Sequence, residues 1–304
     1  MLSRIILGLQ LLSDPFWIKS SIYKNLLITV LYQKVCSITT ITFVAIFTIR
    51  RKITMNHTAI LNLTTDLGYK GFKEAYIRQI EDIAYHSLGF EERLYQLLQA
   101  QDVFLNNKRV SMNLKLSKIK NKQALLEDLD YDPKRKLNKA QILSLASMDF
   151  IRARQNIIIN GKTGTGKTFL AESFAIRAIQ EGFSAYYIRT ATLLEEINLS
   201  RIDGSYTNLV KRFARYKLLI LDDFGISPIT ADDATNLFEI IEARNQMAST
   251  IITSQLPVKD WYGYLQNNTI ADAILDRVVN SSHRVFIDGD SLRPKYGKIA
   301  KDYE

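Results

Sequence analysis

The stretch Gln155–Ile179, QNIIINGKTGTGKTFLAESFAIRAI, joins an apolar run, a glycine-rich turn and a helix-like segment. The apolar run Asn156–Asn160 is typical of a buried strand. After it, GKTGTGKT matches the P-loop pattern GxxxxGK[ST] at every fixed position. Its glycines let backbone amides turn toward a phosphate at a helix N-terminus, where the helix dipole favours anions. We therefore predict a phosphate-binding loop; the alternative is a glycine-rich turn that binds nothing.

Each residue type in this loop suits a nucleotide with its metal ion. The Lys167 ammonium would reach the β and γ phosphates of ATP, and the Thr168 hydroxyl would hold Mg²⁺. ATP and Mg²⁺ are therefore the predicted cofactors. The predicted nucleotide contacts are Gly161, Lys162, Thr163, Gly164, Thr165, Gly166, Lys167 and Thr168.

A second motif, KLLILDDFG, supplies acids at the end of another buried strand. Leu218–Leu221 is a short apolar run, and it ends in Asp222 and Asp223, as a Walker-B strand does. We predict that Asp222 holds Mg²⁺ and that Asp223 orients and deprotonates the attacking water. Paired acids at a strand end also occur as helix caps or turns, which is the alternative.

Three further apolar stretches predict strands, and helix-like segments lie between them: Ser184–Arg189, Ser249–Ser254 and Arg284–Ile287. Short apolar strands that alternate with helices indicate a parallel sheet covered on both faces. Ser254 and Gln255 then follow a strand at its carboxyl end, where polar groups meet ligands in such sheets. The simpler interpretation of these two residues is the start of a loop.

Arg277, in the helix-like stretch AILDRVVNSSHRV, has three interpretations. It is a surface arginine, or a partner for an acid such as Asp272 or Asp276, or an arginine finger offered to the ATP of a neighbouring subunit. The spacing does not choose among them.

Before the nucleotide-binding unit, the sequence predicts a small helical domain. Leu94, Leu97, Leu98 and Val103 follow helical spacing, with charged residues on the other faces. No acid occurs between Lys108 and Lys122, and such a basic run suits either a solvated helix face or a nucleic-acid backbone. Its six basic residues are the first candidate DNA contacts: Lys108, Arg109, Lys115, Lys118, Lys120 and Lys122.

Residues 1–54 have a different composition from the rest. They carry seven Lys or Arg and one acid, although the whole chain of 304 residues has a formal net charge of +9. The uncharged run Val35–Ile49 is shorter than a membrane-spanning helix requires, and no signal-peptide pattern fits. We expect translation to begin at Met55, with 1–54 outside the fold and no membrane association. The single cysteine, Cys36, fits a reducing compartment and a cytoplasmic location.

The order of these motifs resembles the IstB-like ATP-binding family, the transposition helper ATPases of bacterial insertion sequences, which are related to DnaC helicase loaders within the AAA+ superfamily. The resemblance runs from about Asp66 to about Arg293. It rests on Gly89–Leu94, Leu126–Tyr131, Asp149–Ile151, Lys217–Gly225, Ser249–Trp261 and Ala273–Arg293.

The resemblance implies an α/β fold, a P-loop AAA+ core of five parallel strands between helices and without a large C-terminal lid, preceded by the helical domain. It implies Ser254 as the sensor-1 residue and Arg277 as the arginine finger, so both join Asp223 as candidate catalytic residues. A helical insert, Thr190–Arg215, would face DNA, which adds Arg201, Lys211 and Arg212 to the candidate contacts.

Three departures from the family pattern affect the expected site. GKTGTGKT replaces GPPGVGKT but keeps the glycines and Lys-Thr. The shorter second carboxylate of Asp222-Asp223, where the family often has Asp-Glu, is expected to slow hydrolysis. TSQ replaces TSN, which leaves Ser254 and Gln255 as alternative sensors of the γ phosphate.

The predicted function is an ATPase that assembles as a homo-oligomer on target duplex DNA, without strong sequence preference, with ATP at subunit interfaces and a cognate transposase as partner. A DnaC-like helicase loader is the main alternative, and a small-molecule kinase is a third. The predicted organisation is an extension at 1–54, a helical domain at 55–125, a linker with a connecting helix at 126–148, and the ATPase domain at 149–304.

Overall fold

The structure, a computed structural model, describes residues 57–293, so the expectations about residues 1–54 lie outside the described residues. The chain divides into two compact units between Val103 and Phe104, inside one helix, α4 (Phe90–Leu116). Within residues 57–293, no helix combines the length and apolar character needed to cross a bilayer. The domain bounds expected from the sequence remain a prediction.

The first unit is helical, as the sequence predicts. It contains helical residues 57–66, α3 (Lys70–Glu81), the short 3-10 helix η1 (Ile83–Ser87) and the first half of α4. Two glutamine side chains join α3 to α4: Gln79 Nε2 donates to the Arg93 carbonyl at 3.0 Å, and Gln101 Oε1 accepts from the Phe72 N–H at 3.1 Å.

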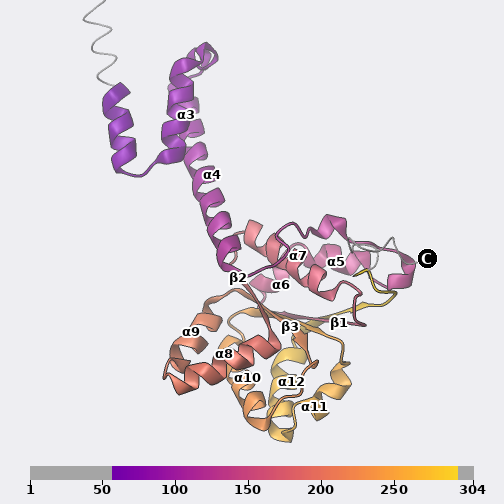
Figure 1. Cartoon of the computed structure of the whole chain (residues 1–304). Helices are drawn as coiled ribbons and strands as arrows, with labels where there is room; N and C mark the ends of the chain where they lie inside the picture. The colour runs from indigo at the N-terminus through magenta and orange to yellow at the C-terminus, as the bar shows by residue number, and fades with distance from the viewer. Residues whose placement is uncertain (1–56, 294–304) are drawn as a thin grey trace, which may run out of the picture. The chain divides into compact units, whose positions relative to one another are not determined.

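The second unit is built around one parallel sheet in the order β2-β3-β4-β1-β5, which confirms the predicted α/β fold with helices on both faces (Figure 1). The strands are β1 (Asn156–Gly161), β2 (Ala185–Arg189), β3 (Leu218–Phe224), β4 (Ser249–Ser254) and β5 (Ser282–Ile287). All five run in one direction, so their carboxyl ends meet at one edge, where ligands bind in such sheets.

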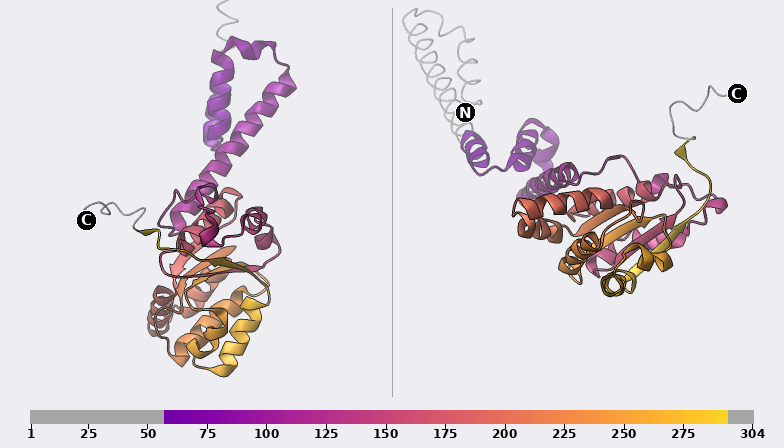
Figure 2. Two further views of the ribbon diagram at one scale, coloured as in Figure 1. Left: turned by 90° about the vertical axis from the view of Figure 1, so that its right-hand side faces the viewer. Right: turned by 60° about the horizontal axis from the view of Figure 1, so that its bottom comes forward.

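Helices cover both faces of this sheet (Figure 2). On one face lie α5 (Lys139–Leu145), α6 (Asp149–Arg152) and α7 (Lys167–Gln180), with the short 3-10 helices η2 (Leu126–Asp128) and η3 (Pro133–Arg135). The other face carries α8 (Thr190–Ile202), α9 (Tyr206–Arg215), α10 (Ala231–Arg244), η4 (Val258–Asp260), α11 (Trp261–Tyr264) and α12 (Asn268–Val279).

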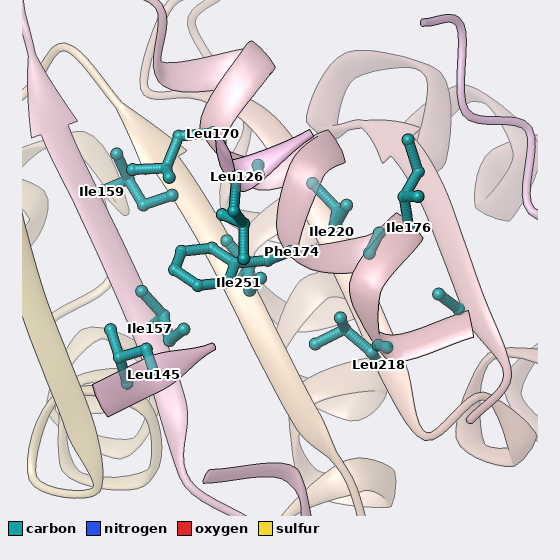
Figure 3. Close-up of a cluster of buried hydrophobic side chains, with 14 of the residues drawn as sticks. Leu126, Leu145, Ile157, Ile159, Leu170, Phe174, Ile176, Leu218, Ile220 and Ile251 are labelled. Carbon is teal, nitrogen blue, oxygen red and sulfur yellow. The ribbon is translucent and has the colours of Figure 1, made fainter. Parts of the chain in front are cut away.

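The two apolar cores explain why β1 and β3 are buried runs rather than alternating ones. Side chains of Ile157 and Ile159 pack under α7 with Phe174 (Figure 3). Ile158, between them, belongs to the core on the opposite face. Because both faces of these strands are covered, Ile157–Ile159 and Leu218–Leu221 are apolar without alternation. The second half of α4 joins the first core through Val110 and Leu114. This packing holds the loops at the carboxyl edge in place.

Candidate nucleotide-binding site

The predicted P-loop connects β1 to α7 as the motif requires. β1 ends at Gly161 and α7 begins at Lys167, with Gly166 as its N-cap at φ +94°. A side chain at Gly166 would be strained at that angle, and a Cβ at Gly161 would meet the Ile287 carbonyl oxygen at 2.2 Å. The glycines therefore serve both the turn and the close approach of β5.

A cavity of about 810 Å³ opens over this loop. The loop side of its lining is formed by Thr163, Gly164, Gly166, Lys167 and Thr168, and Asp223 lies on the wall. The helix N-terminus opens into this space, and the volume is in the range of cofactor sites. The structure thus brings the two predicted motifs to one cavity.

Lys167 is the buried cation of the site. The residue is only 7% exposed, and its Nζ donates to the Lys162 carbonyl oxygen at 2.7 Å. Burial lowers the pKa of Lys167, while the nearby carboxylates Asp223 and Asp222 act in the opposite direction. A buried ammonium beside a cavity is stabilised by an anion that enters it, so a phosphate suits this position.

Asp222 is buried and accepts hydrogen bonds from three hydroxyls. Thr168 Oγ1 lies 3.1 and 3.0 Å from its two oxygens, Tyr187 Oη lies 2.6 Å from Oδ2, and the Thr253 hydroxyl also donates to it. The Thr168 and Asp222 oxygens therefore lie side by side, and hard oxygen donors are what Mg²⁺ prefers. These two residues fit the predicted metal role.

Asp223 has a separate environment because the strand changes register at this point. The β3–β4 pairing is irregular between Leu221 and Phe224, and Asp223 adopts φ +59°, a left-handed angle that aspartate tolerates better than most residues. Its side chain reaches the nucleotide cavity, whereas Asp222 stays buried. Burial first, and then repulsion from Asp222, raise the pKa of Asp223.

Arg189, the last residue of β2, lies beside this acid. Its Nε is 3.6 Å from Asp223 Oδ2, and its positive charge opposes the rise in the pKa of Asp223. Both residues also line a second cavity of about 330 Å³ next to α8. The sequence reasoning did not find Arg189, because an arginine at a strand end has no motif of its own.

Comparison with known proteins decides the family. The family described as IstB-like ATP binding protein matches residues 62–300. This chain belongs to that family. It is 36% identical over 237 residues to the "Putative insertion sequence ATP-binding protein y4pL" of Sinorhizobium fredii, covering 78% of this chain and 96% of the relative. An insertion sequence IS232 putative ATP-binding protein of Bacillus thuringiensis is 31% identical, over 77% of this chain and 94% of the relative.

Solved structures resemble the core of this IstB-like chain more distantly. A structure of DnaI shares 18% identity at a TM-score of 0.48, over 55% of this chain and 92% of that one. A DnaC helicase loader shares 19% at a TM-score of 0.45, over 55% of this chain and 99% of that one. The family model, which matches most of the chain, confirms the resemblance that the motifs indicate.

The IstB-like site distinguishes the two candidate sensor residues by their surroundings. Ser254 is fully buried; its hydroxyl donates to the Phe224 carbonyl at 2.7 Å and accepts from the Leu256 N–H at 3.0 Å. Gln255 instead lines the nucleotide cavity, where its Oε1 accepts from the Thr163 hydroxyl at 2.6 Å. Gln255 therefore faces the cavity, whereas the Ser254 hydroxyl is buried in the turn that follows β4.

Arg277 lies on α12 and lines a different cavity from the one over the P-loop. Its Nε donates to Glu242 on α10, and its guanidinium lies 4.9 Å from the Phe238 ring centroid. The acid that pairs with it is Glu242, not Asp272 or Asp276 as the sequence suggested. A role at another subunit's ATP requires Arg277 to leave Glu242.

The candidate DNA contacts fall into two groups. Those between Lys108 and Lys122 are exposed along the end of α4 and the segment after it. In the insert, Arg201 pairs with Glu239 and Arg212 with Glu196, so both guanidinium groups are already engaged, whereas Lys211 is exposed. The first group is therefore the more accessible to a phosphate backbone.

Arg135, which no motif indicated, braces the P-loop of this IstB-like chain from the linker. It is only 7% exposed, lines the nucleotide cavity, and its Nη2 donates to the Thr165 carbonyl at 2.6 Å. Its own carbonyl accepts from the Asp288 N–H at 2.9 Å. Asp288 in turn pairs with Lys162 at 3.3 Å. The predicted linker, 126–148, therefore contributes a buried residue to the site.

Replacing Arg135 by alanine is expected to weaken ATP binding roughly tenfold. A hydrogen bond from a charged group contributes about 1.5–3 kcal/mol, and its loss frees the loop that surrounds the phosphates. Titration with a fluorescent ATP analogue measures this. Lys136→Ala is the matched control, because the Lys136 side chain is 64% exposed and contacts Asp288 rather than the loop. Equal affinity of the two variants would contradict the bracing role.

Proposed function

We propose that this IstB-like chain is an ATPase that assembles on duplex DNA and serves a transposase as its helper. The main observation in support of ATP hydrolysis is that two neighbouring carboxylates have different surroundings. Asp222 is buried beside Thr168, and Asp223 faces the cavity that Lys167 lines. This difference supports a division of roles in which Asp222 holds a metal ion and Asp223 contacts water. Mg²⁺ held by Thr168 and Asp222 would stabilise charge on the phosphates.

The residues around the cavity would divide the reaction among them. Lys167 binds the β and γ phosphates, and Gln255 contacts the terminal phosphate. Asp223 orients the water and accepts its proton. The raised pKa of Asp223 lies closer to neutral pH than that of an ordinary aspartate, and a pKa near the working pH makes a carboxylate a more effective general base. Loss of the γ phosphate would then remove the contacts that favour the assembled state.

Duplex DNA is the proposed partner because exposed lysines cluster at one place without a neighbouring acid in the sequence. Lys115, Lys118, Lys120 and Lys122 are all exposed, in a run that lacks Asp and Glu. Lysine contacts to phosphates carry no base information, so binding of this kind has little sequence preference and is sensitive to salt. The names of the relatives, which are insertion sequence proteins, support a transposase as the second partner.

Sedimentation of the full chain with random-sequence duplex DNA tests the assembly. We expect large complexes with ATP but not with ADP, and fewer of them at about 200 mM than at about 50 mM salt. A chain that binds ATP but forms no complex with duplex DNA under any nucleotide would overturn the proposal. It would favour a role in protein loading, such as that of the helicase loaders.

Arg277→Ala is expected to bind ATP normally and to lose most of its DNA-stimulated hydrolysis. The reason is that Arg277 is absent from its own chain's nucleotide cavity, so it would act on ATP only across a subunit interface. Removing such a finger costs roughly 10³-fold in rate. ATPase assays with and without duplex DNA measure it, and Arg284→Ala, at an exposed position on β5, is the control. Full activity would assign Arg277 to a structural pair with Glu242.

A further inference from the structure

Tyr187 connects the metal-binding carboxylate to a segment outside the nucleotide cavity. It lies in the middle of β2 and is only 4% exposed. Its hydroxyl donates to Asp222 Oδ2 at 2.6 Å, on the same carboxylate that receives Thr168. A hydrogen bond from a fixed ring restricts rotation of the carboxylate, so Tyr187 holds Asp222 in one orientation.

The backbone N–H of Tyr187 forms a hydrogen bond on the side of β2 that faces away from the rest of the sheet. β2 is the edge strand of the sheet, so its outer backbone groups have no strand partner. The Tyr187 N–H instead donates to the Ser117 carbonyl at 2.7 Å, just after α4 ends. Ser117 is fully buried and Ile119 is 3% exposed, so this segment packs firmly against the edge. One residue therefore bridges Ser117 and Asp222.

A second attachment joins the segment to the P-loop helix. Glu172, on α7 and 4% exposed, accepts from the Lys120 N–H at 3.0 Å through its Oε1. The Lys120 ammonium lies 5.7 Å from the Tyr187 ring centroid, within the range of a cation–π contact. The segment Ser117–Asn121 is thus held between Tyr187 and Glu172, both of which belong to elements of the nucleotide site.

The same segment carries side chains that suit a phosphate backbone. Lys118, at φ +59°, and Lys120 and Lys122 are exposed, and within residues 57–293 no ion pair engages them. An anion that binds these lysines would pull on the backbone of Ser117–Lys122. That backbone is connected to Asp222 through the hydrogen bonds that Tyr187 forms with Ser117 and with Asp222. The Ser117–Tyr187 and Tyr187–Asp222 hydrogen bonds give a shift of the segment a continuous physical route to the carboxylate.

We infer that Tyr187 is a positioning residue for Asp222, and that it couples duplex DNA bound at Ser117–Lys122 to the affinity of the site for Mg²⁺-nucleotide. The coupling part rests on the proposed DNA binding. By linkage, DNA that tightens Mg²⁺-nucleotide binding is itself bound more tightly when Mg²⁺-nucleotide is present. The Tyr187–Asp222 contact thereby gives the site a way to respond to DNA.

The first test is Tyr187→Phe in the full chain, with binding rather than turnover as the readout. Dissociation of a fluorescent ATP analogue is measured against Mg²⁺ concentration. We expect the Mg²⁺ needed for half-maximal effect to rise roughly tenfold, the cost typical of losing a partner that orients a metal ligand. Binding without Mg²⁺ should stay the same, because phenylalanine keeps the ring.

Tyr186→Phe is the matched control, since Tyr186 is the neighbouring residue and its ring packs with Phe213 and Tyr216 in the opposite core. It should leave the Mg²⁺ dependence unchanged. A Tyr187→Phe protein with unchanged Mg²⁺ dependence would overturn the positioning role. So would a loss of affinity that is equal with and without Mg²⁺, because that result indicates a structural role alone.

The second test adds duplex DNA to the same titration. In the unaltered protein DNA should lower the Mg²⁺ requirement, and in Tyr187→Phe this effect should vanish while DNA binding without nucleotide persists. A DNA effect of equal size in both proteins would contradict the coupling. If the unaltered protein binds no duplex DNA, the proposed function fails and the coupling with it, whereas the Mg²⁺ titration without DNA still judges the Tyr187–Asp222 contact.

Discussion

Lys167→Ala is expected to weaken ATP binding roughly a hundredfold or more. The ammonium is buried beside the cavity, and burial has already lowered its pKa, so it gains a counter-ion when the phosphates enter. Truncating one partner of a buried, hydrogen-bonded charge pair costs about 2–5 kcal/mol, part of which is the penalty for leaving the other charge unpaired. Equilibrium titration with a fluorescent ATP analogue measures the loss.

The P-loop itself supplies the matched control for this variant. Lys162→Ala removes the same charge five residues before Lys167, but the Lys162 side chain is 78% exposed and pairs with Asp288 instead. We expect a small effect from this variant. Thermal unfolding of both proteins without nucleotide checks that the fold is intact. A folded Lys167→Ala protein with near-normal ATP affinity would refute the phosphate role.

Asp223→Asn is expected to bind ATP normally and to hydrolyse it roughly 10²- to 10⁴-fold more slowly, which is the usual contribution of a general base. Asparagine has nearly the same shape and also tolerates the left-handed backbone that residue 223 adopts, so the fold should not change. Single-turnover hydrolysis, measured beside ATP affinity, separates chemistry from binding. Because the proposed assembly requires ATP, this variant should also persist on duplex DNA.

Asp232→Asn is the control for the loss of one negative charge, since Asp232 is exposed at the start of α10 and is absent from the lining of the nucleotide cavity. It should hydrolyse ATP at the normal rate. Rapid turnover by Asp223→Asn would remove Asp223 as the base. A loss of ATP binding in that variant would instead show that Asp223 contributes to the binding of ATP rather than to the hydrolysis step.

The P-loop, the acid pair and the parallel sheet could all be predicted from the amino-acid sequence alone. In the stretch Asn156–Thr168 each local requirement is met by residue type: apolar side chains for a strand covered on both faces, and glycines where the backbone must turn and approach β5 closely. Such requirements extend over only a few residues. They can therefore be read in the chain without knowing what lies opposite.

Neighbouring residues of similar type have different surroundings, and these could not be predicted before the fold was known. Asp222 and Asp223 look alike in sequence, but a register shift buries one and turns the other to the cavity. The same holds for Ser254 and Gln255, since only their neighbours show which one faces the P-loop. One extra residue at the end of a strand that is covered on both faces leaves no clear trace in hydrophobic patterning, because such a strand does not alternate.

Contacts between residues far apart in the chain were equally beyond the sequence. Arg135 reaches Thr165 from the linker, Arg277 pairs with Glu242, and Tyr187 joins Ser117 to Asp222. In the sequence each of these residues has an ordinary setting: Arg135 lies in a basic linker, Arg277 on a helix surface and Tyr187 in a buried strand. Their roles arise from which elements the sheet order brings together, and that order is set by the packing of the whole unit rather than by any short stretch.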